Sequence, residues 1–322
     1  MEFDLIARHF TRATPSAVLG VGDDCALLAP TPGMQLAVSS DMLLEGRHFS
    51  PQDSPAGIGH KSLAVNLSDL AAMGATPRWA TLSIALPTAD DAWLTAFARG
   101  FFRIADLHGI ELVGGDTTRG ALTISITVMG EVPPGQALRR DGAQAGDDVW
   151  VSGVIGSAAT ALAYRQGRLF MEQIDAAKVL PALYLPTPRV ELGIALRGVA
   201  TSAIDISDGL LADLGHILER SGVGAGPIGA RLEFAALPTL PVVQQYLHEP
   251  VAHDCVLAGG DDYELCFTAP AGKRDAVHAA AESTGVAVTR IGRISAEPGL
   301  VVIGADGQPL AIEHTGYDHF AA

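Results

Sequence analysis

Short acidic segments stand at the ends of apolar runs in six places along this sequence. They use Asp rather than Glu and read GDD (22–24), SSD (39–41), LSD (67–69), GGD (114–116), DISD (205–208) and GGDD (259–262). Converging carboxylates repel one another unless a cation lies between them. Oxygen donors without His or Cys suit magnesium better than zinc, so the pattern predicts a magnesium site assembled from separate elements. Helix capping is the alternative, and it would explain one or two of the six segments.

The apolar runs between these segments predict a mixture of strands and helices. In the first half we expect strands at 35–40, 79–86, 110–113 and 122–128, and helices at 58–73 and after Pro87, with Thr88 as N-cap. Segment 114–116 is expected to be a tight turn that ends the strand before it. In the second half the pattern predicts strands near 149–152, 202–206, 265–268, 286–291 and 300–303, and helices near 156–166, 188–196 and 207–222. Regions 222–241 and 247–255 show no regular pattern.

A polar stretch rich in Gly and Pro, 132–148, separates the two halves. We therefore expect two domains, 1–138 and 139–322, as the length also suggests. NLSDLAAMG (66–74) resembles DISDGLLADLG (205–215), and a Gly-Gly-Asp follows each. Two related halves would give this likeness, and so would chance, because both are common turn sequences.

Composition excludes several classes of protein. The formal net charge is −15, whereas a nucleic-acid-binding protein usually carries the opposite sign. No run of 18 apolar residues offers a membrane span, and the first residues lack the apolar core of a signal peptide, so we expect a cytoplasmic protein. The three cysteines form no C-x-x-C pair.

The sequence also lacks a P-loop motif and the motifs of protein kinases. It has only three lysines, Lys61, Lys178 and Lys273. If a polyphosphate binds, magnesium, arginine and backbone N–H groups have to neutralise it. Gly114 and Gly115 would let the backbone approach such a ligand closely.

Seven segments together carry a family resemblance. They are GVGDDCALL (20–28), SSDMLLEGRHF (39–49), KSLAVNLSDLAAMGA (61–75), LVGGDTTRG (112–120), AIDISDGL (203–210), GGDDYELCFT (259–268) and GYDHF (316–320). In this order they resemble the thiamine-monophosphate kinase family, part of the aminoimidazole ribonucleotide synthetase-like superfamily, nearly end to end. The resemblance implies an N-terminal α/β domain that pairs in a homodimer, a C-terminal α+β domain and a cleft for ATP and substrate.

The implied reaction is the direct in-line transfer of the γ-phosphoryl group of ATP onto thiamine monophosphate, giving thiamine diphosphate with the help of several magnesium ions. The acceptor phosphate is already ionised at neutral pH, so no protein general base is expected. Alternatives are another ATP-dependent synthetase of the superfamily, either a cyclo-ligase or a selenophosphate synthetase-like enzyme, and a non-catalytic acidic metal-binding protein. Cys25 follows an acidic segment but lacks the Gly-rich neighbourhood that a selenophosphate synthetase would need.

The resemblance also implies roles for individual residues. The metal ligands would be Asp24, Ser39, Ser40, Asp41, Asp69, Asp116, Asp205 and Asp208. The residues that meet ATP would be Gly115, Asp116, Arg140, Ser207 and His108. Those that meet thiamine phosphate would be His48, Asp261 and Tyr317.

Two positions depart from the usual pattern of the family. Asp261 stands where Glu is common, which shortens the side chain by one methylene group. His108 stands where Tyr is common, and a histidine beside a helix C-terminus is the alternative reading. Without the resemblance, His48 and Arg140 would be read as surface residues and Tyr317 as a packing anchor.

Overall fold

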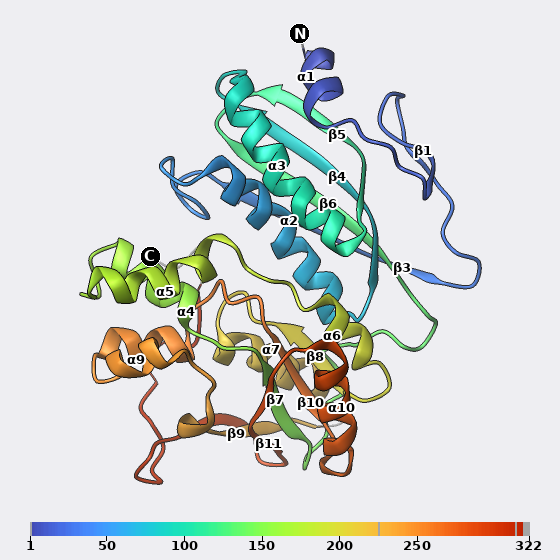
Figure 1. Ribbon diagram of the computed structural model, residues 1–322. Helices are drawn as coiled ribbons and strands as arrows, with labels where there is room; N and C mark the ends of the chain where they lie inside the picture. The colour runs from blue at the N-terminus through green and yellow to red at the C-terminus, as the bar shows by residue number, and fades with distance from the viewer. Residues whose placement is uncertain (1, 225, 313, 318–322) are drawn as a thin grey trace. The chain divides into compact units, whose positions relative to one another are not determined.

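The first half of the chain folds around a four-stranded sheet with the strand order β3-β6-β4-β5. Its strands are β3 (Gln35–Leu44), β4 (Thr76–Leu86), β5 (Glu111–Arg119) and β6 (Thr123–Val132). β5 runs parallel to β4, and the other neighbouring strands are antiparallel. Helices α2 (Pro55–Ala72) and α3 (Asp91–His108) lie along one face of the sheet (Figure 1). This computed structural model describes residues 2–224, 226–312 and 314–317.

The second half contains a six-stranded mixed sheet with the order β12-β9-β11-β7-β10-β8. Its strands are β7 (Asp148–Ser152), β8 (Ser202–Asp205), β9 (Gly229–Glu233), β10 (Leu265–Ala269), β11 (Val288–Ser295) and β12 (Gly299–Ile303). Its helices are α4 (Ser157–Arg165), α5 (Gln173–Tyr184), α6 (Val190–Ala195), α7 (Leu210–Gly222), α8 (Pro241–Tyr246), α9 (Pro250–Leu257) and α10 (Arg274–Thr284). Two short 3-10 turns, Phe234–Ala236 and Ala271–Lys273, complete it.

The chain divides by its internal contacts into two units. The first unit is Met1–Leu70 with Ala75–Gly135, and the second is Ala71–Gly74 with Gln136–Ala322. Besides its sheet, the first unit holds α1 (Glu2–His9) and the short paired strands β1 (Ala17–Leu19) and β2 (Leu27–Leu28). Among the described residues, no helix combines the length and apolar character needed to cross a membrane.

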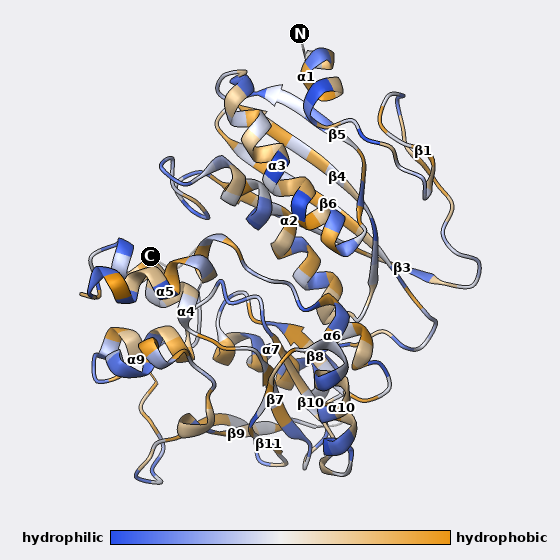
Figure 2. Cartoon of the chain, viewed as in Figure 1, coloured by the Kyte–Doolittle hydropathy of each residue, from blue (hydrophilic) through white to orange (hydrophobic). Residues whose placement is uncertain are grey.

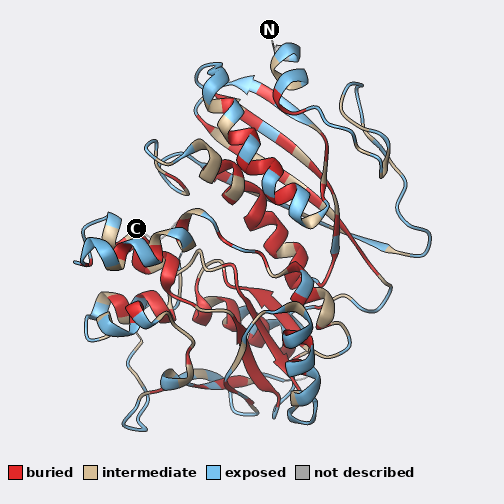
Figure 3. Ribbon diagram, in the orientation of Figure 1, coloured by how far each residue is buried: buried red, intermediate tan, exposed pale blue. Residues whose placement is uncertain are grey.

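Burial follows the apolar strands in each unit (Figure 2, Figure 3). In the first unit Ile124, Ile126 and Val128 alternate along β6 and are wholly buried, as the pattern at 122–128 predicts. In the second unit Val149 and Val151 of β7 lie in a core shared with the surrounding helices. Such buried apolar rows contribute about 25 cal/mol per Å² and dominate the stability of each unit.

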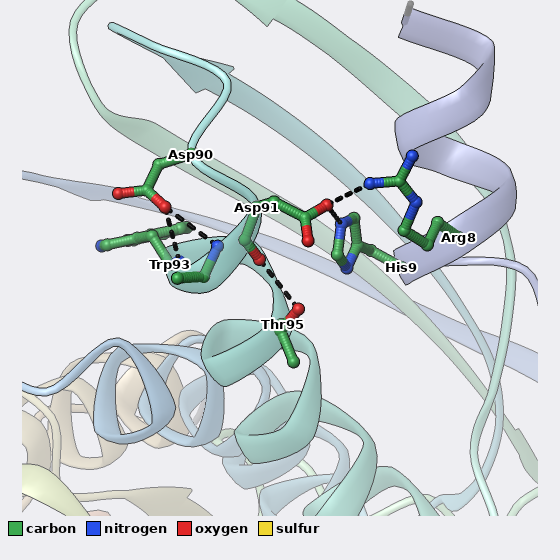
Figure 4. A network of polar contacts seen from close by, with 7 residues as sticks. Arg8, His9, Asp90, Asp91, Trp93 and Thr95 are labelled. Atoms are coloured by element: carbon green, nitrogen blue, oxygen red, sulfur yellow. Dashed lines mark hydrogen bonds and ion pairs between the residues drawn. The ribbon is translucent and has the colours of Figure 1, made fainter.

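Helix α3 shows how local sequence sets an element boundary. Asp90 is the N-cap, because its carboxylate accepts the backbone N–H groups of Ala92 (2.9 Å) and Trp93 (3.1 Å) (Figure 4). The prediction of Thr88 as N-cap is therefore wrong by two residues. The helix ends at Gly109, which adopts the left-handed conformation with φ 64°.

The N-terminal helix α1 is fastened to α3 by charged groups. Arg8 and His9 both bind the carboxylate of Asp91, the first residue of α3 (Figure 4). The hydrogen bond from His9, and then that from Arg8, lower the pKa of Asp91. Farther along, Arg12 donates to Asp106 at 3.1 Å and its guanidinium lies 3.7 Å from the ring centre of Phe102.

Most predicted strands and helices are present, but two acidic segments differ. The strand at 110–113 continues to Arg119, so the turn predicted at 114–116 is wrong. The strand predicted at 35–40 continues to Leu44, which places Asp41 inside it. At Gly115 (φ 148°), an added Cβ would lie 1.8 Å from the carbonyl oxygen of Leu82. Glycine thus allows β5 to pass close to β4 at a register shift instead of turning away.

The sequence likeness between 66–74 and 205–215 does not extend to local structure. Asp69 lies inside α2, whereas Asp208 lies in the turn between β8 and α7. The following Gly-Gly-Asp is inside β5 in one case and in the loop between α9 and β10 in the other. The two segments therefore give no structural sign of a duplication.

Candidate functional site

One group of predicted metal ligands lies where β3 passes α2 in the first unit. Ser39 Oγ donates to Asp69 Oδ2 over 2.5 Å. The backbone N–H of Asp41 donates to Oδ1 of Asn66 over 3.0 Å, and Asn66 is fully buried. Ser39 and Asp41 share one face of β3 because alternate residues point the same way. Ser39, Asp41 and Asp69 thus form a compact oxygen-rich group. The prediction omitted Asn66, for which its place in the NLSD segment was the only signal.

Asp116 does not join this group within the sheet. Asp41, Ile126, Leu82 and Gly115 form one row across the four strands, and Asp116 lies in the next row with Met42. Its side chain is therefore on the opposite face, where it is exposed. β3 and β5 are also three strand spacings apart, roughly 14 Å.

Ser40 lies on this same outer face. Its hydroxyl donates to the carbonyl of Ile126 (3.1 Å) and accepts from Thr127 Oγ1 (3.0 Å). The sheet therefore separates Ser40 and Asp116 from Ser39 and Asp41.

Asp24 is exposed on the loop between β1 and β2. Two carboxylates hold the ends of this segment. Glu111 accepts the backbone N–H (3.1 Å) and the hydroxyl (2.7 Å) of Ser16, and Glu131 accepts the backbone N–H (2.6 Å) and the hydroxyl (2.9 Å) of Thr31. The loop that carries Asp24 is thus fixed at its base.

The two histidines of the first unit occupy different settings. His48 Nδ1 accepts the backbone N–H of Leu44 over 3.0 Å, so the proton of the neutral ring is on Nε2. The side chain is half-buried in the turn after β3. His108 is the last residue of α3, which is the setting of the helix-end alternative.

In the second unit the DISD segment forms a turn between β8 and α7. Asp213 Oδ2 accepts the backbone N–H groups of Ser207 (3.0 Å), Asp208 (3.1 Å) and Gly209 (3.1 Å). Burial, and then the Asp208 carboxylate, raise the pKa of Asp213 to about 6, although these N–H groups lower it. Asp205 ends β8 and is 4% exposed, and Asp208 is half-buried. The prediction missed Asp213, whose only signal was its place in the segment DISDGLLADLG (205–215).

Backbone hydrogen bonds bring three predicted segments together around this turn. The N–H of Asp261 donates to the carbonyl of Ser207 (2.9 Å), and the N–H of Tyr317 donates to that of Asp208 (2.9 Å). At Gly260 an added Cβ would lie 2.3 Å from the Ser207 carbonyl oxygen. The GGDD loop and Tyr317 therefore lie directly against the DISD turn. The rest of the GYDHF motif, 318–320, lies outside the described residues.

The loop from 258 to 264, between α9 and β10, carries the GGDD segment and is called the GGDD loop here. It contains the two residues other than glycine that have positive φ among the described part of the chain. They are Asp261 (φ 71°) and Tyr263 (φ 51°). Each such conformation costs on the order of 1–3 kcal/mol and persists only where the surroundings enforce it. Strain of this kind concentrates at functional sites, and here it coincides with a predicted substrate contact.

Two buried carboxylates anchor the C-terminal part of this loop. Glu264 is 4% exposed, binds Arg189 and accepts the hydroxyl of Ser152 over 2.5 Å. Burial alone would lower the pKa of Arg189, but Glu264 raises it. Asp262 Oδ2 accepts the N–H of Gly156 at the start of α4 over 2.8 Å, and burial raises its pKa well above the ordinary range. Asp262 thus fixes the backbone just before α4. The prediction did not include Glu264 or Arg189.

Arg140 is exposed in the stretch before β7. Its carbonyl accepts the hydroxyl of Ser221 over 2.9 Å. The carbonyl of its neighbour Arg139 accepts the N–H of Ala203 in β8 over 2.9 Å. The backbone at Arg140 is therefore fixed beside the strand that leads to Asp205.

The donor set fits magnesium in its chemistry. Ser39, Asp41 and Asp69 offer only oxygen, and so do Asp205 and Asp208. Within 2–224, 226–312 and 314–317, no group of three or more His, Cys, Asp or Glu side chains is placed to hold an ion.

Comparison with protein families gives two matches that together span most of the chain. The AIR synthase related protein, N-terminal domain, matches residues 22–132. The AIR synthase related protein, C-terminal domain, matches residues 144–305. The predicted fold class, a two-domain fold of this type with α/β and α+β parts, is thereby confirmed.

Individual proteins give a narrower result. The thiamine-monophosphate kinase of Salmonella typhimurium is 45% identical over 324 residues, covering 99% of this chain and 98% of its own. The crystal structure of thiamine-monophosphate kinase from Stenotrophomonas maltophilia K279a has a TM-score of 0.84 and 50% identity over 96% of each chain. The structure of AaThiL complexed with AMPPCP and TMP has a TM-score of 0.77 and 29% identity, covering 91% of this chain and 89% of its own. The chain therefore belongs to the AIR synthase related proteins and, among them, to the thiamine-monophosphate kinase family.

Proposed function

We propose that this protein phosphorylates thiamine monophosphate with ATP, giving thiamine diphosphate and ADP. The observation that carries the proposal is the full-length similarity to kinases of this name, together with a neighbour solved with AMPPCP and TMP. The convergence of the DISD turn, the GGDD loop and Tyr317 in the second unit supports it. We also propose that the protein acts in the cytoplasm, as the sequence predicts.

In this reaction two polyanions have to approach each other, so the main task is to reduce their repulsion. Magnesium, when bound, supplies positive charge between the phosphates. Its proposed ligands are Asp24, Ser39, Ser40, Asp41, Asp69, Asp116, Asp205 and Asp208. Of these, Ser39, Asp41 and Asp69 are the best placed to act together, because they share one region of the first unit.

The remaining residues have roles in binding the two substrates. We propose that ATP is contacted by Gly115, Asp116, Arg140, Ser207 and His108, with the guanidinium of Arg140 neutralising phosphate charge. His48, Asp261 and Tyr317 contact thiamine monophosphate. Asp261 suits the cationic thiazolium or the amino group of the pyrimidine, and Tyr317 can offer its ring face to the cation. Residues 1–138 thus carry most of the proposed metal ligands, whereas the proposed substrate contacts are divided equally between 1–138 and 139–322.

We also propose a homodimer through the outer face of the first sheet. Edge strand β3 exposes alternate apolar side chains there, including Val38 (61% exposed) and Met42 (54% exposed). Exposed apolar residues on an edge strand are a liability unless another chain covers them. A second copy on this face would lie beside Asp116 and Ser40, which explains how these residues could serve a site that Asp41 does not share.

The proposed reaction is tested by mixing protein, ATP, Mg²⁺ and thiamine monophosphate and separating the products by chromatography. We expect thiamine diphosphate and ADP in equal amounts, and none when Mg²⁺ is removed with a chelator. The variant Asp69→Asn should lose at least about a hundredfold in rate while keeping the melting temperature of the wild type. Absence of thiamine diphosphate at every Mg²⁺ concentration would disprove the proposal. ATP hydrolysis without transfer would favour another synthetase of the superfamily.

A further inference from the structure

Tyr263 lies directly against the proposed substrate contact Asp261. Its hydroxyl donates to Asp261 Oδ1 over 3.0 Å, and the tyrosine is 9% exposed. Both residues have positive φ, 71° for Asp261 and 51° for Tyr263. The backbone at these two residues is left-handed and not extended. This conformation brings the ring of Tyr263 back to the carboxylate of Asp261.

The surrounding backbone enforces this conformation. The N–H of Asp261 donates to Ser207 O (2.9 Å), the N–H of Tyr263 donates to Ile206 O (2.8 Å), and the N–H of Ile206 donates to Glu264 O (2.8 Å). The Tyr263–Asp261 contact is therefore built on the same hydrogen bonds that join the GGDD loop to the DISD turn. A bulky residue at positive φ is unusual, which argues that the position of this ring has a use.

We propose that Tyr263 is a positioning residue that orients the Asp261 carboxylate for thiamine monophosphate. This inference rests on the proposed function. A carboxylate has two oxygens with about four lone-pair sites, so it can accept the tyrosine hydroxyl and still accept an N–H group or face a cation. The hydroxyl holds the carboxylate in one rotamer, and the short Asp side chain, in place of the Glu common in the family, keeps that carboxylate within reach of the ring.

The test compares Tyr263→Phe, Asp261→Asn and the double variant in steady-state kinetics with each substrate varied in turn. A hydrogen bond to a charged group is typically worth about a tenfold change in binding, so Tyr263→Phe should raise KM for thiamine monophosphate about tenfold. The kcat and the KM for ATP should stay within about twofold, because the lost contact binds the ground and transition states alike. In the Asp261→Asn background, Tyr263→Phe should add nothing further, since the tyrosine acts through the carboxylate.

Tyr246→Phe is the matched control. The hydroxyl of Tyr246 donates to Asp175 Oδ2 over 3.0 Å. Both residues belong to the second unit and lie outside the GGDD loop. Tyr246→Phe should therefore leave both KM values within about twofold of the wild type. Calorimetric titration of thiamine monophosphate into each variant, without ATP, measures the dissociation constant directly. This measurement compares the variants even if part of a sample is unfolded, because only the folded protein binds.

Two results would overturn the inference alone: an active enzyme whose KM for thiamine monophosphate is unchanged by Tyr263→Phe, or equal losses from Tyr263→Phe with and without Asp261. The second result would mean that the tyrosine acts on the fold and not through the carboxylate. A wild-type protein that forms no thiamine diphosphate would overturn the proposed function, and the inference with it.

Discussion

At the scale of single residues, a buried carboxylate shapes the acidic turn of the second unit. Asp213 is 2% exposed and accepts three consecutive backbone N–H groups, from Ser207 to Gly209. These N–H groups precede α7, so no backbone carbonyl of the helix accepts them. The side chain of Asp213, which is a residue of α7, accepts them instead. The positions of Ser207 and Asp208 thus depend on a residue that is itself outside the predicted site.

Replacing Asp213 by Ala should destabilise the protein by about 2–4 kcal/mol, because three N–H groups would be left buried without an acceptor. Asp213→Asn keeps one acceptor oxygen and should cost about half as much. Urea denaturation followed by circular dichroism measures both. If Asp213→Ala were as stable as the wild type, the three hydrogen bonds would not be what holds the turn.

Asp148, at the start of β7, gives a pH dependence with a defined sign. Its carboxylate is 0% exposed and accepts two hydrogen bonds from Arg274, at 2.6 and 2.9 Å. Burial raises its pKa, but Arg274, then Arg290 and Arg293, outweigh this and lower it below 3.8. A pKa lowered in the folded state means that the ionised group stabilises the fold above about pH 4, and that this stability is lost as the pH falls further.

Asp148→Asn should therefore lower stability at pH 7 by about 1–2 kcal/mol, a figure that allows for solvent around the half-exposed arginines. The variant should lose less stability than the wild type between about pH 4 and pH 2, because it has no carboxylate to protonate. Urea midpoints measured across this range test the difference. Parallel losses in the two proteins would contradict the assignment.

At the scale of elements, the first sheet depends on the close approach of β4 and β5. Gly115 permits this approach, since a Cβ there would meet the backbone of Leu82 at 1.8 Å. Its neighbour Gly114 has open space within 4 Å of an added Cβ. The same dipeptide therefore contains one glycine that the sheet requires and one that it does not.

Gly115→Ala should destabilise the first unit by about 3 kcal/mol, because the strands have to separate and the residue has a positive φ. Gly114→Ala, the matched control, should change stability by less than about 1 kcal/mol. Thermal melts of the two variants test this directly. Equal destabilisation by both would show that the close contact at Gly115 is not the cause.

Apolar periodicity predicted most elements but not which face each acidic residue occupies. The alternation of Ile124, Ile126 and Val128 identified β6 correctly. The predicted strand at 110–113 ended before Gly114, because glycine pairs usually mark turns. In the structure β5 continues through both glycines, so tertiary packing overrode that preference. A shift of one residue reverses the face of every side chain, so the separation of Asp116 from Asp41 required the observed strand pairing.

At the scale of the whole molecule, the family and the two-part fold could be predicted because the resembling segments run nearly from end to end. Asn66 and Glu264, which hold these segments in place, could not, since each acts through contacts distant in sequence. Asp213 could not either, because its contacts to Ser207, Asp208 and Gly209 depend on the exact turn that the backbone makes before α7. Assembly lies at this scale too, and the exposed row on β3 makes it testable.

Val38→Lys should convert the proposed homodimer to a monomer, because a charged side chain cannot be buried against a second apolar face without a partner. Val38 is 61% exposed, so the substitution leaves the single chain with a solvated lysine and an intact core. Ile174→Lys is the matched control, since Ile174 is 73% exposed on α5 in the second unit. Size-exclusion chromatography with light scattering at micromolar concentration should give half the wild-type mass for Val38→Lys and the full mass for Ile174→Lys.

If Asp116 serves a site completed by the second copy, Val38→Lys also loses activity in proportion to the dimer lost, and activity returns at high protein concentration. A wild-type protein that is monomeric under these conditions, or a fully active Val38→Lys monomer, would rule out this role for the outer face.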